Sequence, residues 1–231
     1  MSDFEYNNRK ASEFRVYMKA FPNIPVPQKR YNEVEVSGKD GKYLEESGYE
    51  DIDIPLELNF IIKDTKWHDR VRQIKNWLLE STNRELIFED DAAFFYKVKK
   101  VELGEIEHTT RRIGNLTVSF TCEPYTYLRN GKVKMKSEEA EQNPYLLCKP
   151  VYYVQGEGLC IINVNGKNME ANVSGNLIID TERMLAYRED GTLSNTKITG
   201  EYEDLYLKPG RNRISVSPGF VLQVKPNWRC L

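Results

Sequence analysis

Alternation of apolar and polar residues dominates the first half of the chain. The longest run has an apolar side chain at every second position, and these are Ile52, Ile54, Leu56, Leu58 and Phe60. Because successive side chains of a β-strand point to opposite faces, the run predicts a strand with one buried and one solvent-exposed face. Shorter runs predict further strands at residues 14–18, 31–36, 85–88, 94–101 and 116–122, and residues 103–113 resemble a strand that bends and returns.

Residues 64–80 depart from this alternation and follow the spacing of a helix. Their apolar stripe recurs at steps of four, three and four residues, and it consists of Trp67, Val71, Ile74 and Leu78. Charged side chains fall largely on the other side, so we predict an amphipathic core helix that lies on the sheet. Asp64 or Thr65 is expected to cap its first turn. A recognition helix for DNA is the alternative, but the large apolar groups favour a core position.

Residues 37–51 follow neither pattern, because they are rich in glycine and charge. Their larger apolar side chains are only Tyr43, Leu44 and Tyr49, so the segment cannot bury itself. One interpretation is a flexible surface loop. The other is an extended arm that becomes ordered by lying on another subunit, with these three side chains as its anchors.

From Tyr145 onwards, short strands recur at regular intervals between turn signals. Asn165-Gly166 and Asp190-Gly191 supply the positive φ angles of tight hairpins. This pattern predicts a second β-sandwich, with Trp228 sealing one end. The polar, charge-rich stretch before it is the natural linker. We therefore predict an N-terminal domain at residues 1–135 with its arm at 36–51, a linker at 136–144 and a C-terminal sandwich at 145–231.

Composition and charge limit the function classes. The chain has 231 residues, 40% of them hydrophobic, and a formal net charge of −2, which does not suit a nucleic-acid clamp. The four cysteines, Cys122, Cys148, Cys160 and Cys230, have no metal-ligand spacing, so we expect free and mostly buried thiols. No signal peptide or membrane span is recognised in the sequence, which predicts folding in a cytoplasm and no membrane insertion.

Candidate chemistry is sparse. His68 and His108 are the only histidines, and both are interpreted as structural. Asp51 and Asp53 fit the solvent face of a strand, and the acidic residues 89–91 fit a solvated turn. No catalytic motif occurs, so we expect no catalytic residue, no metal and no cofactor. Trp228 is a possible sugar or partner contact, which leaves a carbohydrate-binding module as the alternative function; a hydrolase is disfavoured.

Four blocks of sequence, taken together, resemble a known family. They are VSGKDGKYLEESGYEDIDIPLEL from Val36, DRVRQIKNWLL from Asp69, RELIFEDDAAFFYKVKKVELGEIE from Arg84 and IGNLTVSFTCEPYTY from Ile113. Their order and spacing over residues 14–127 are similar to the N-terminal domain of siphophage distal tail proteins, and Trp228-Arg229 is similar to the end of the C-terminal domain of that family. The chain departs from the family pattern at residues 37–41, where a proline and an arginine are more common.

The fold class we predict with this resemblance is mainly β, with an N-terminal β-sandwich that carries one packed α-helix and an extended arm, followed by a C-terminal galectin-like β-sandwich. The resemblance also implies a structural role: a ring, usually a hexamer, at the virion tail tip, assembled in the cytoplasm of a bacterial host. The implied partners are the tail tube protein, the tail-associated hub protein, the tape measure protein and a receptor-binding protein, while DNA only passes through. The arm that embraces the neighbouring subunit corresponds to Val36, Gly38, Lys39, Asp40, Gly41, Tyr43, Leu44 and Tyr49.

Overall fold

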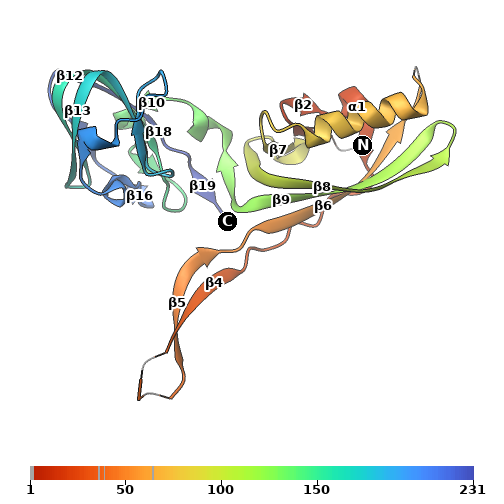
Figure 1. Ribbon diagram of the computed structural model, residues 1–231, viewed down its shortest axis with the longest axis horizontal. Coiled ribbons are helices and arrows are strands. Elements are labelled where there is room, and N and C mark those ends of the chain that lie inside the picture. Colours follow the sequence, from red (N-terminus) through yellow and green to blue (C-terminus); the bar gives the residue numbers. More distant parts are fainter. Residues whose placement is uncertain (1–2, 36, 39, 64) are drawn as a thin grey trace. The chain divides into compact units, whose positions relative to one another are not determined.

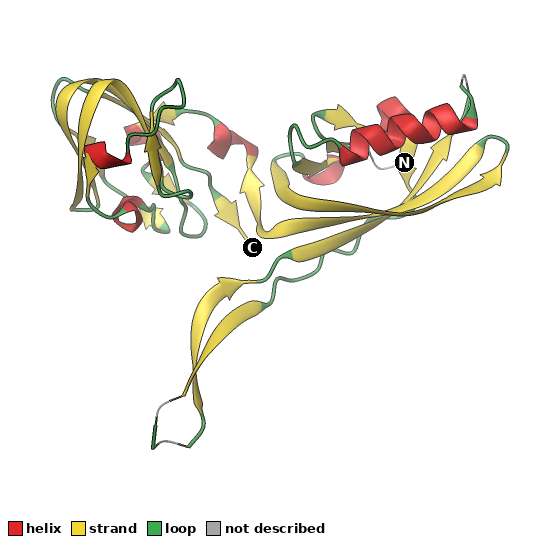
Figure 2. Ribbon diagram, in the orientation of Figure 1, coloured by secondary structure: helices red, strands yellow, loops and turns green. Residues whose placement is uncertain are grey.

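The computed structural model describes residues 3–35, 37–38, 40–63 and 65–231. The chain forms two compact units, Met1–Thr126 with Leu231, and Tyr127–Cys230. Strands make up most of both units, and the described residues contain one α-helix, α1 (Trp67–Leu79) (Figure 2). The predicted mainly β architecture with a single packed helix is confirmed.

The first unit is built on one large, mostly antiparallel sheet with α1 packed on one face (Figure 1). Its strand order is β2-β1-β7-β8-β9-β6-β3. The strands are β1 (Phe4–Tyr6), β2 (Arg9–Lys10), β3 (Val16–Met18), β6 (Ile52–Ile61), β7 (Glu85–Phe88), β8 (Phe94–Thr110) and β9 (Ile113–Leu128). A separate hairpin is formed by β4 (Lys29–Glu35) and β5 (Lys42–Tyr49).

The alternation in β6 sets the core of this unit. All of its predicted inward positions are buried, while Asp51 and Asp53 are exposed, as predicted. Opposite them, β9 presents its own buried side chains in register, and the pairs are Ile52↔Cys122, Ile54↔Phe120, Leu56↔Val118 and Leu58↔Leu116. Two strands with matching inward faces give an apolar surface that a helix can cover.

Helix α1 lies on this surface, but its buried side differs from the predicted stripe. Ile74 and Leu78 are fully buried, whereas Trp67 and Val71 are only partly buried against the core. Trp77, which the predicted stripe omits, is 2% exposed. Lys66 occupies the N-cap without a side-chain hydrogen bond, so Thr65 is not the cap, and Asp64, the other predicted cap, lies outside the described residues.

Trp77 joins the helix to the N-terminal segment. Its ring stacks on Phe14 with centroids 4.4 Å apart, and its indole N–H donates to the carbonyl of Tyr6 at 2.9 Å. Asn7, with a φ of 57°, donates to the carbonyl of Glu80 at 2.6 Å and so satisfies the end of the helix. The C-terminus of α1 is therefore held by residues that precede it by about seventy positions.

Strand β8 is longer than predicted. The sequence predicts a strand at 94–101 and, separately, a strand that bends and returns at 103–113. The structure joins the first strand to the outgoing part of the second, because β8 continues to Thr110 and turns into β9 at residues 111–112. The inward-facing side chains change from even-numbered to odd-numbered residues at Lys99–Lys100, where two exposed residues follow each other. This explains why strict alternation is lost in the sequence while the strand goes on.

The second unit contains a seven-stranded sheet with the main order β10-β18-β12-β13-β14. Its strands are β10 (Met135–Lys136), β12 (Val151–Val164), β13 (Lys167–Asp180), β14 (Leu185–Tyr187), β15 (Ile198–Thr199), β17 (Ile214–Val216) and β18 (Val221–Lys225). The turn Asn165-Gly166 joins β12 to β13 with φ angles of 54° and 85°, as the sequence predicts for a tight hairpin. The short strands β11 (Gln142–Asn143) and β16 (Gly210–Arg211) pair with each other, and β19 (Arg229–Cys230) pairs with β9.

The stretch predicted as a linker is part of this second unit. Residues 136–144 include the end of β10, a 3₁₀ turn at Ser137–Ala140 and β11, and Ala140 and Asn143 are fully buried. The Asn143 amide donates to the carbonyls of Leu146 and Leu207. A polar, charged sequence thus folds here because its few buried groups have defined partners.

Two adjacent leucines of α1 test this account of the core. Leu78 is fully buried and Leu79 is 58% exposed. We expect Leu78→Ala to lower the unfolding free energy of the first unit by about 2–5 kcal/mol, because it leaves a cavity under the helix. Leu79→Ala should change it by no more than about 0.5 kcal/mol. Urea denaturation followed by amide hydrogen exchange in β9 measures both, and equal losses would contradict the burial described here.

Candidate functional site

The feature that stands apart from both cores is the β4–β5 hairpin, which we call the arm (residues 29–49). Its strands pair only with each other, and every described residue from 29 to 47 is exposed (Figure 1). The arm begins at Lys29, before the predicted start at residue 36, and its turn contains Gly38 and Gly41, both with a φ of 82°. Val36 and Lys39 lie outside the described residues.

The two faces of the arm differ in charge. On one face, Lys42 forms ion pairs with Glu33 and Glu35, and Lys29 pairs with Glu46 at 2.7 Å. Register places Val34 opposite Tyr43, and Asn32 opposite Glu45, on the other face. Because adjacent residues of a strand point to opposite sides, Tyr43 and Leu44 project from different faces.

The base of the arm is fixed to its own unit. The ring of Tyr49 packs edge-on against Tyr125 with centroids 6.0 Å apart, and the Glu50 N–H donates to the carbonyl of Gln28 at 2.8 Å. Gly48, with a φ of 122°, sits beside a register shift between Arg30 and Tyr31. Of the three predicted anchors, Tyr49 is thus half-buried at the base, while Tyr43 and Leu44 are exposed.

The segment before the arm adds apolar surface that the sequence analysis did not identify. Phe21, Ile24 and Val26 are 62%, 42% and 77% exposed within residues 19–28, which form no strand. Prolines at 22, 25 and 27 separate them and exclude strand pairing. The sequence does contain a signal for this exposure, because apolar side chains that alternate with prolines cannot pair into a sheet and so are not carried into its core. The segment therefore exposes three large apolar side chains directly before the arm.

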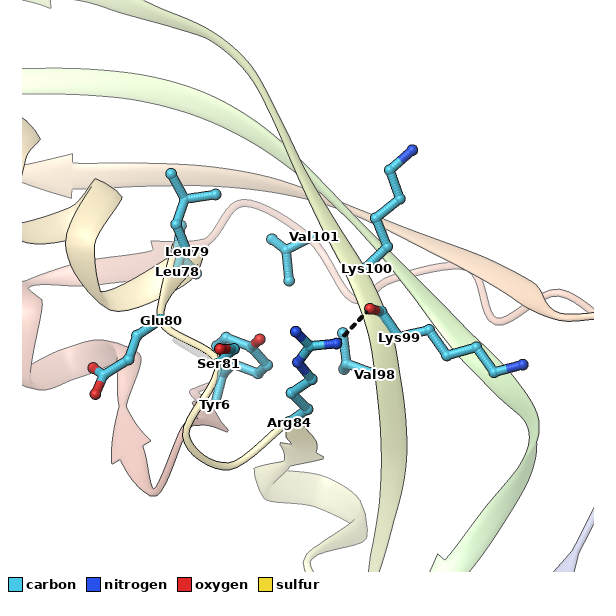
Figure 3. A pocket seen from close by; sticks show the side chains of 10 residues that line it. All are labelled: Tyr6, Leu78, Leu79, Glu80, Ser81, Arg84, Val98, Lys99, Lys100 and Val101. Carbon is cyan, nitrogen blue, oxygen red and sulfur yellow. Dashed lines mark hydrogen bonds between the residues drawn. The ribbon is translucent and has the colours of Figure 1, made fainter. Parts of the chain in front are cut away.

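A small pocket lies where the end of α1 meets β8 (Figure 3). Its volume is about 230 Å³, and it is lined by Tyr6, Leu78, Leu79, Glu80, Ser81, Arg84, Val98, Lys99, Lys100 and Val101. The Arg84 guanidinium donates to the carbonyl of Lys99 at 2.9 Å. Leu79 and Val101 contribute apolar side chains to the lining, so the pocket combines an apolar wall with a cation.

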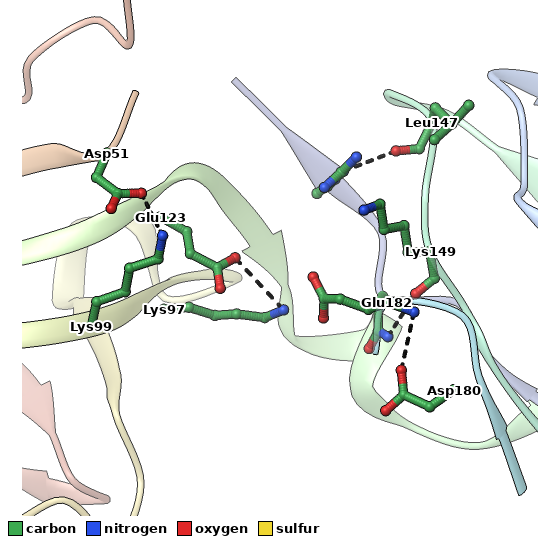
Figure 4. A network of polar contacts seen from close by, with 10 residues as sticks. Asp51, Lys97, Lys99, Glu123, Leu147, Lys149, Asp180 and Glu182 are labelled. Carbon is green, nitrogen blue, oxygen red and sulfur yellow. Dashed lines mark hydrogen bonds and ion pairs between the residues drawn. The ribbon is translucent and has the colours of Figure 1, made fainter. Parts of the chain in front are cut away.

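Acidic residues near this sheet have structural partners. Asp51 pairs with Lys99 at 2.6 Å and Glu123 with Lys97 at 3.8 Å (Figure 4). Asp53 accepts a hydrogen bond from the Thr121 hydroxyl. Exposed pairs of this kind contribute little to stability, and their carboxylates are engaged across strands. Within the described part of the chain, no group of three or more potential ligands is placed to hold a metal.

The remaining candidate residues lie in structural settings. His108 stacks on Trp67 with centroids 3.7 Å apart, and His68 is exposed near the start of α1. Trp228 is 8% exposed and packs in the core of the second unit, so its ring offers no open platform for a sugar. No helix among the described residues has the length and apolar character needed to cross a bilayer.

Comparison with known proteins assigns the class. An exposed arm on a mainly β body is typical of a subunit of a larger assembly. The family model described as phage tail protein N-terminal domain matches residues 1–124, so the chain belongs to that family of phage tail structural proteins. This confirms the resemblance found in the sequence. No curated protein matches the chain.

Solved structures share the whole fold. The Dit protein of phage SPP1, described as a paradigm of the hub adsorption apparatus in phages that infect Gram-positive bacteria, superimposes with a TM-score of 0.63 at 12% identity, with 100% of both chains covered. A chain of the phage P2 baseplate in its activated conformation with calcium gives a TM-score of 0.50 at 9% identity, with 100% of this chain and 98% of that chain covered. The likeness concerns the fold.

The cysteines give a test of the two cores. All four are thiols; Cys122, Cys148 and Cys160 are buried, and Cys230 is half-buried. Burial raises the pKa of Cys122 to about 12 and that of Cys160 to about 11, and it also raises the pKa of Cys148. The thiolate is the reactive form, so at about pH 8 we expect iodoacetamide to modify Cys230 first in the native protein. Peptide mass spectrometry checks this; equal labelling of Cys122 without denaturant would contradict it.

Proposed function

We propose that this protein forms a ring of six copies at the distal end of a phage tail. The ring joins the tail tube to the hub and receptor-binding apparatus at the tip, and its channel passes the tape measure protein and then DNA. The N-terminal unit forms the ring. The role is structural and not catalytic, and assembly takes place in the cytoplasm of the bacterial host.

The observation that carries this proposal is the agreement in fold with SPP1 Dit over the full length of both chains. Membership of a phage tail family supports the same setting. The arm supports self-association, because a two-stranded hairpin is at best marginally stable alone and needs a surface to pack on. A contact between an arm and a different surface of an identical copy is head-to-tail, and such contacts close into rings when the rotation allows.

The charge of the chain suits a channel for DNA. With a net charge of −2, the protein has no excess of cations to retain the phosphate backbone through counterion release. A ring that DNA crosses must not bind it. The alternative of a carbohydrate-binding module in host adhesion is less well supported, because the predicted sugar contact Trp228 is buried in its own core.

Removal of the arm tests the ring. Residues 29–49 can be replaced by Asn-Gly, since the hydrogen bond from Glu50 to Gln28 already places the two chain ends opposite each other. We expect folded monomers of this variant, because the surface that bridges copies is gone. Native mass spectrometry of the intact protein should give assemblies of six 27.0 kDa chains, and circular dichroism should show that the variant keeps its fold.

A matched control shortens only the turn of the arm. Glu35 and Lys42 are opposite each other in register, so Asn-Gly in place of residues 36–41 keeps both strands. This variant should still form rings. Unchanged rings after loss of the whole hairpin would contradict a role for the arm in assembly.

A further inference from the structure

The pocket between α1 and β8 contains a cation without a matching anion. Arg84 is exposed, donates one hydrogen bond to a carbonyl and forms no ion pair with a carboxylate among the described residues. The other cations that line the pocket differ, because Lys99 is paired with Asp51 and Lys100 with Glu102. Figure 3 shows the Arg84 side chain between Tyr6 and Val98, with its guanidinium directed to the Lys99 carbonyl.

The pocket exists because β7 stops pairing with β8. The last paired residues are Glu85 with Lys97, and the Val98 N–H donates to the Arg84 carbonyl just beyond them. Past this point β8 runs on beside the end of α1 without β7, which leaves about 230 Å³. Clefts for small-molecule ligands usually have about 300–1,000 Å³. The space therefore suits one or two protein side chains better than a metabolite.

The arm carries an aromatic group and a carboxylate on the face that has no ion pairs among the described residues, and these groups are complementary to the pocket. Tyr43 is 51% exposed, and Glu45, two residues further on, projects from the same side of β5. Glu45 forms no ion pair with a cation among the described residues, whereas Glu33, Glu35 and Glu46 are all paired on the opposite face. An aromatic side chain beside an available carboxylate matches a pocket with an apolar wall and an available guanidinium.

We propose that the Tyr43–Glu45 face of the arm of one copy docks into this pocket of the adjacent copy. The Tyr43 ring packs against Leu79 and Val101, and the Glu45 carboxylate binds Arg84. This inference rests on the proposed ring and adds the contact that closes it.

The spacing of the two sides agrees. Residues two apart on a strand are about 7 Å apart. This is the spacing of Tyr43 and Glu45 on the arm. It is also the spacing of Val101 and Lys99, whose carbonyl holds Arg84, on the pocket side. Burial of an aromatic group next to a charge-assisted hydrogen bond is the usual composition of an energetically dominant contact. The arm and the pocket are different surfaces, so the contact is head-to-tail, and one contact per copy closes into a ring when the rotation allows.

Charge reversal tests the contact. Arg84→Glu and Glu45→Arg should each weaken assembly at least about tenfold, measured as the concentration of half-assembly in sedimentation velocity, because like charges then meet at the interface. The variant that carries both substitutions should assemble almost as well as the unaltered protein, because the opposite charges then meet again. Leu79→Ala should weaken assembly while leaving folding intact, because Leu79 is exposed in the monomer.

Mixing the two single variants shows whether the contact joins different copies. In an equimolar mixture, the arm with Glu45 meets a pocket with Arg84, and the arm with arginine meets the pocket with glutamate. Copies that alternate around a ring therefore satisfy every contact, and the mixture should assemble although neither variant does alone. Recovery in the double variant without recovery in the mixture would overturn the proposal, because it would place the contact within one chain.

Controls separate this inference from the proposed function. Glu35→Arg reverses a carboxylate on the opposite face of the arm, and Arg213→Glu reverses an exposed arginine of the second unit; both should assemble normally. If loss of the arm abolishes the ring but both charge reversals at Arg84 and Glu45 leave it intact, the docking contact is wrong and the ring stands. If the unaltered protein forms no ring, the proposed function itself fails.

Discussion

A two-stranded hairpin cannot bury its side chains on itself, and this constraint shapes the first unit. The arm pairs with no other strand, exposes Tyr43 and Leu44, and is attached through the Tyr49–Tyr125 contact and a backbone hydrogen bond at its base. The body that holds it must therefore be stable without it. The sheet, α1 and the Trp77 cluster supply this stability, since they form a buried apolar core of their own and leave the arm as surface for assembly.

The parts of the fold that were predictable are those in which one physical signal acts alone. Strict alternation in β6 predicted which of its side chains are buried, and Asn165-Gly166 predicted the β12–β13 hairpin. Prediction failed where two signals compete. In β8 a change of parity at Lys99–Lys100 interrupts the alternation without ending the strand. Trp77 was missed because its partners, Phe14 and Tyr6, approach from the N-terminal segment, and helical spacing carries no information about where those lie.

The candidate site was predictable as a segment but not as a surface. Glycine and charge in residues 37–51 indicated a stretch that cannot bury itself. They did not reveal that Lys29–Glu35 forms the second strand of the arm, because residues 31–36 are predicted as an ordinary strand of the main sheet. Nor could sequence divide the arm into a face of paired charges and a face with Glu45 available, since that division depends on register. The pocket at Arg84 arises from the end of β7 pairing and has no local sequence signal.

A ring component has to bind its neighbours in one orientation only. Apolar contact alone does little to fix the orientation of two copies, because its free energy is roughly proportional to the buried area and does not depend on direction. A single pair of opposite charges next to an aromatic group adds direction, since any other register leaves a charge without its partner. On the strands of the arm, Glu33, Glu35 and Glu46 are already paired within the copy, which makes the contact through Glu45 selective. The ion pairs on the opposite face of the arm then have a role beyond stability: they leave Glu45 as a distinct carboxylate for a neighbour to recognise.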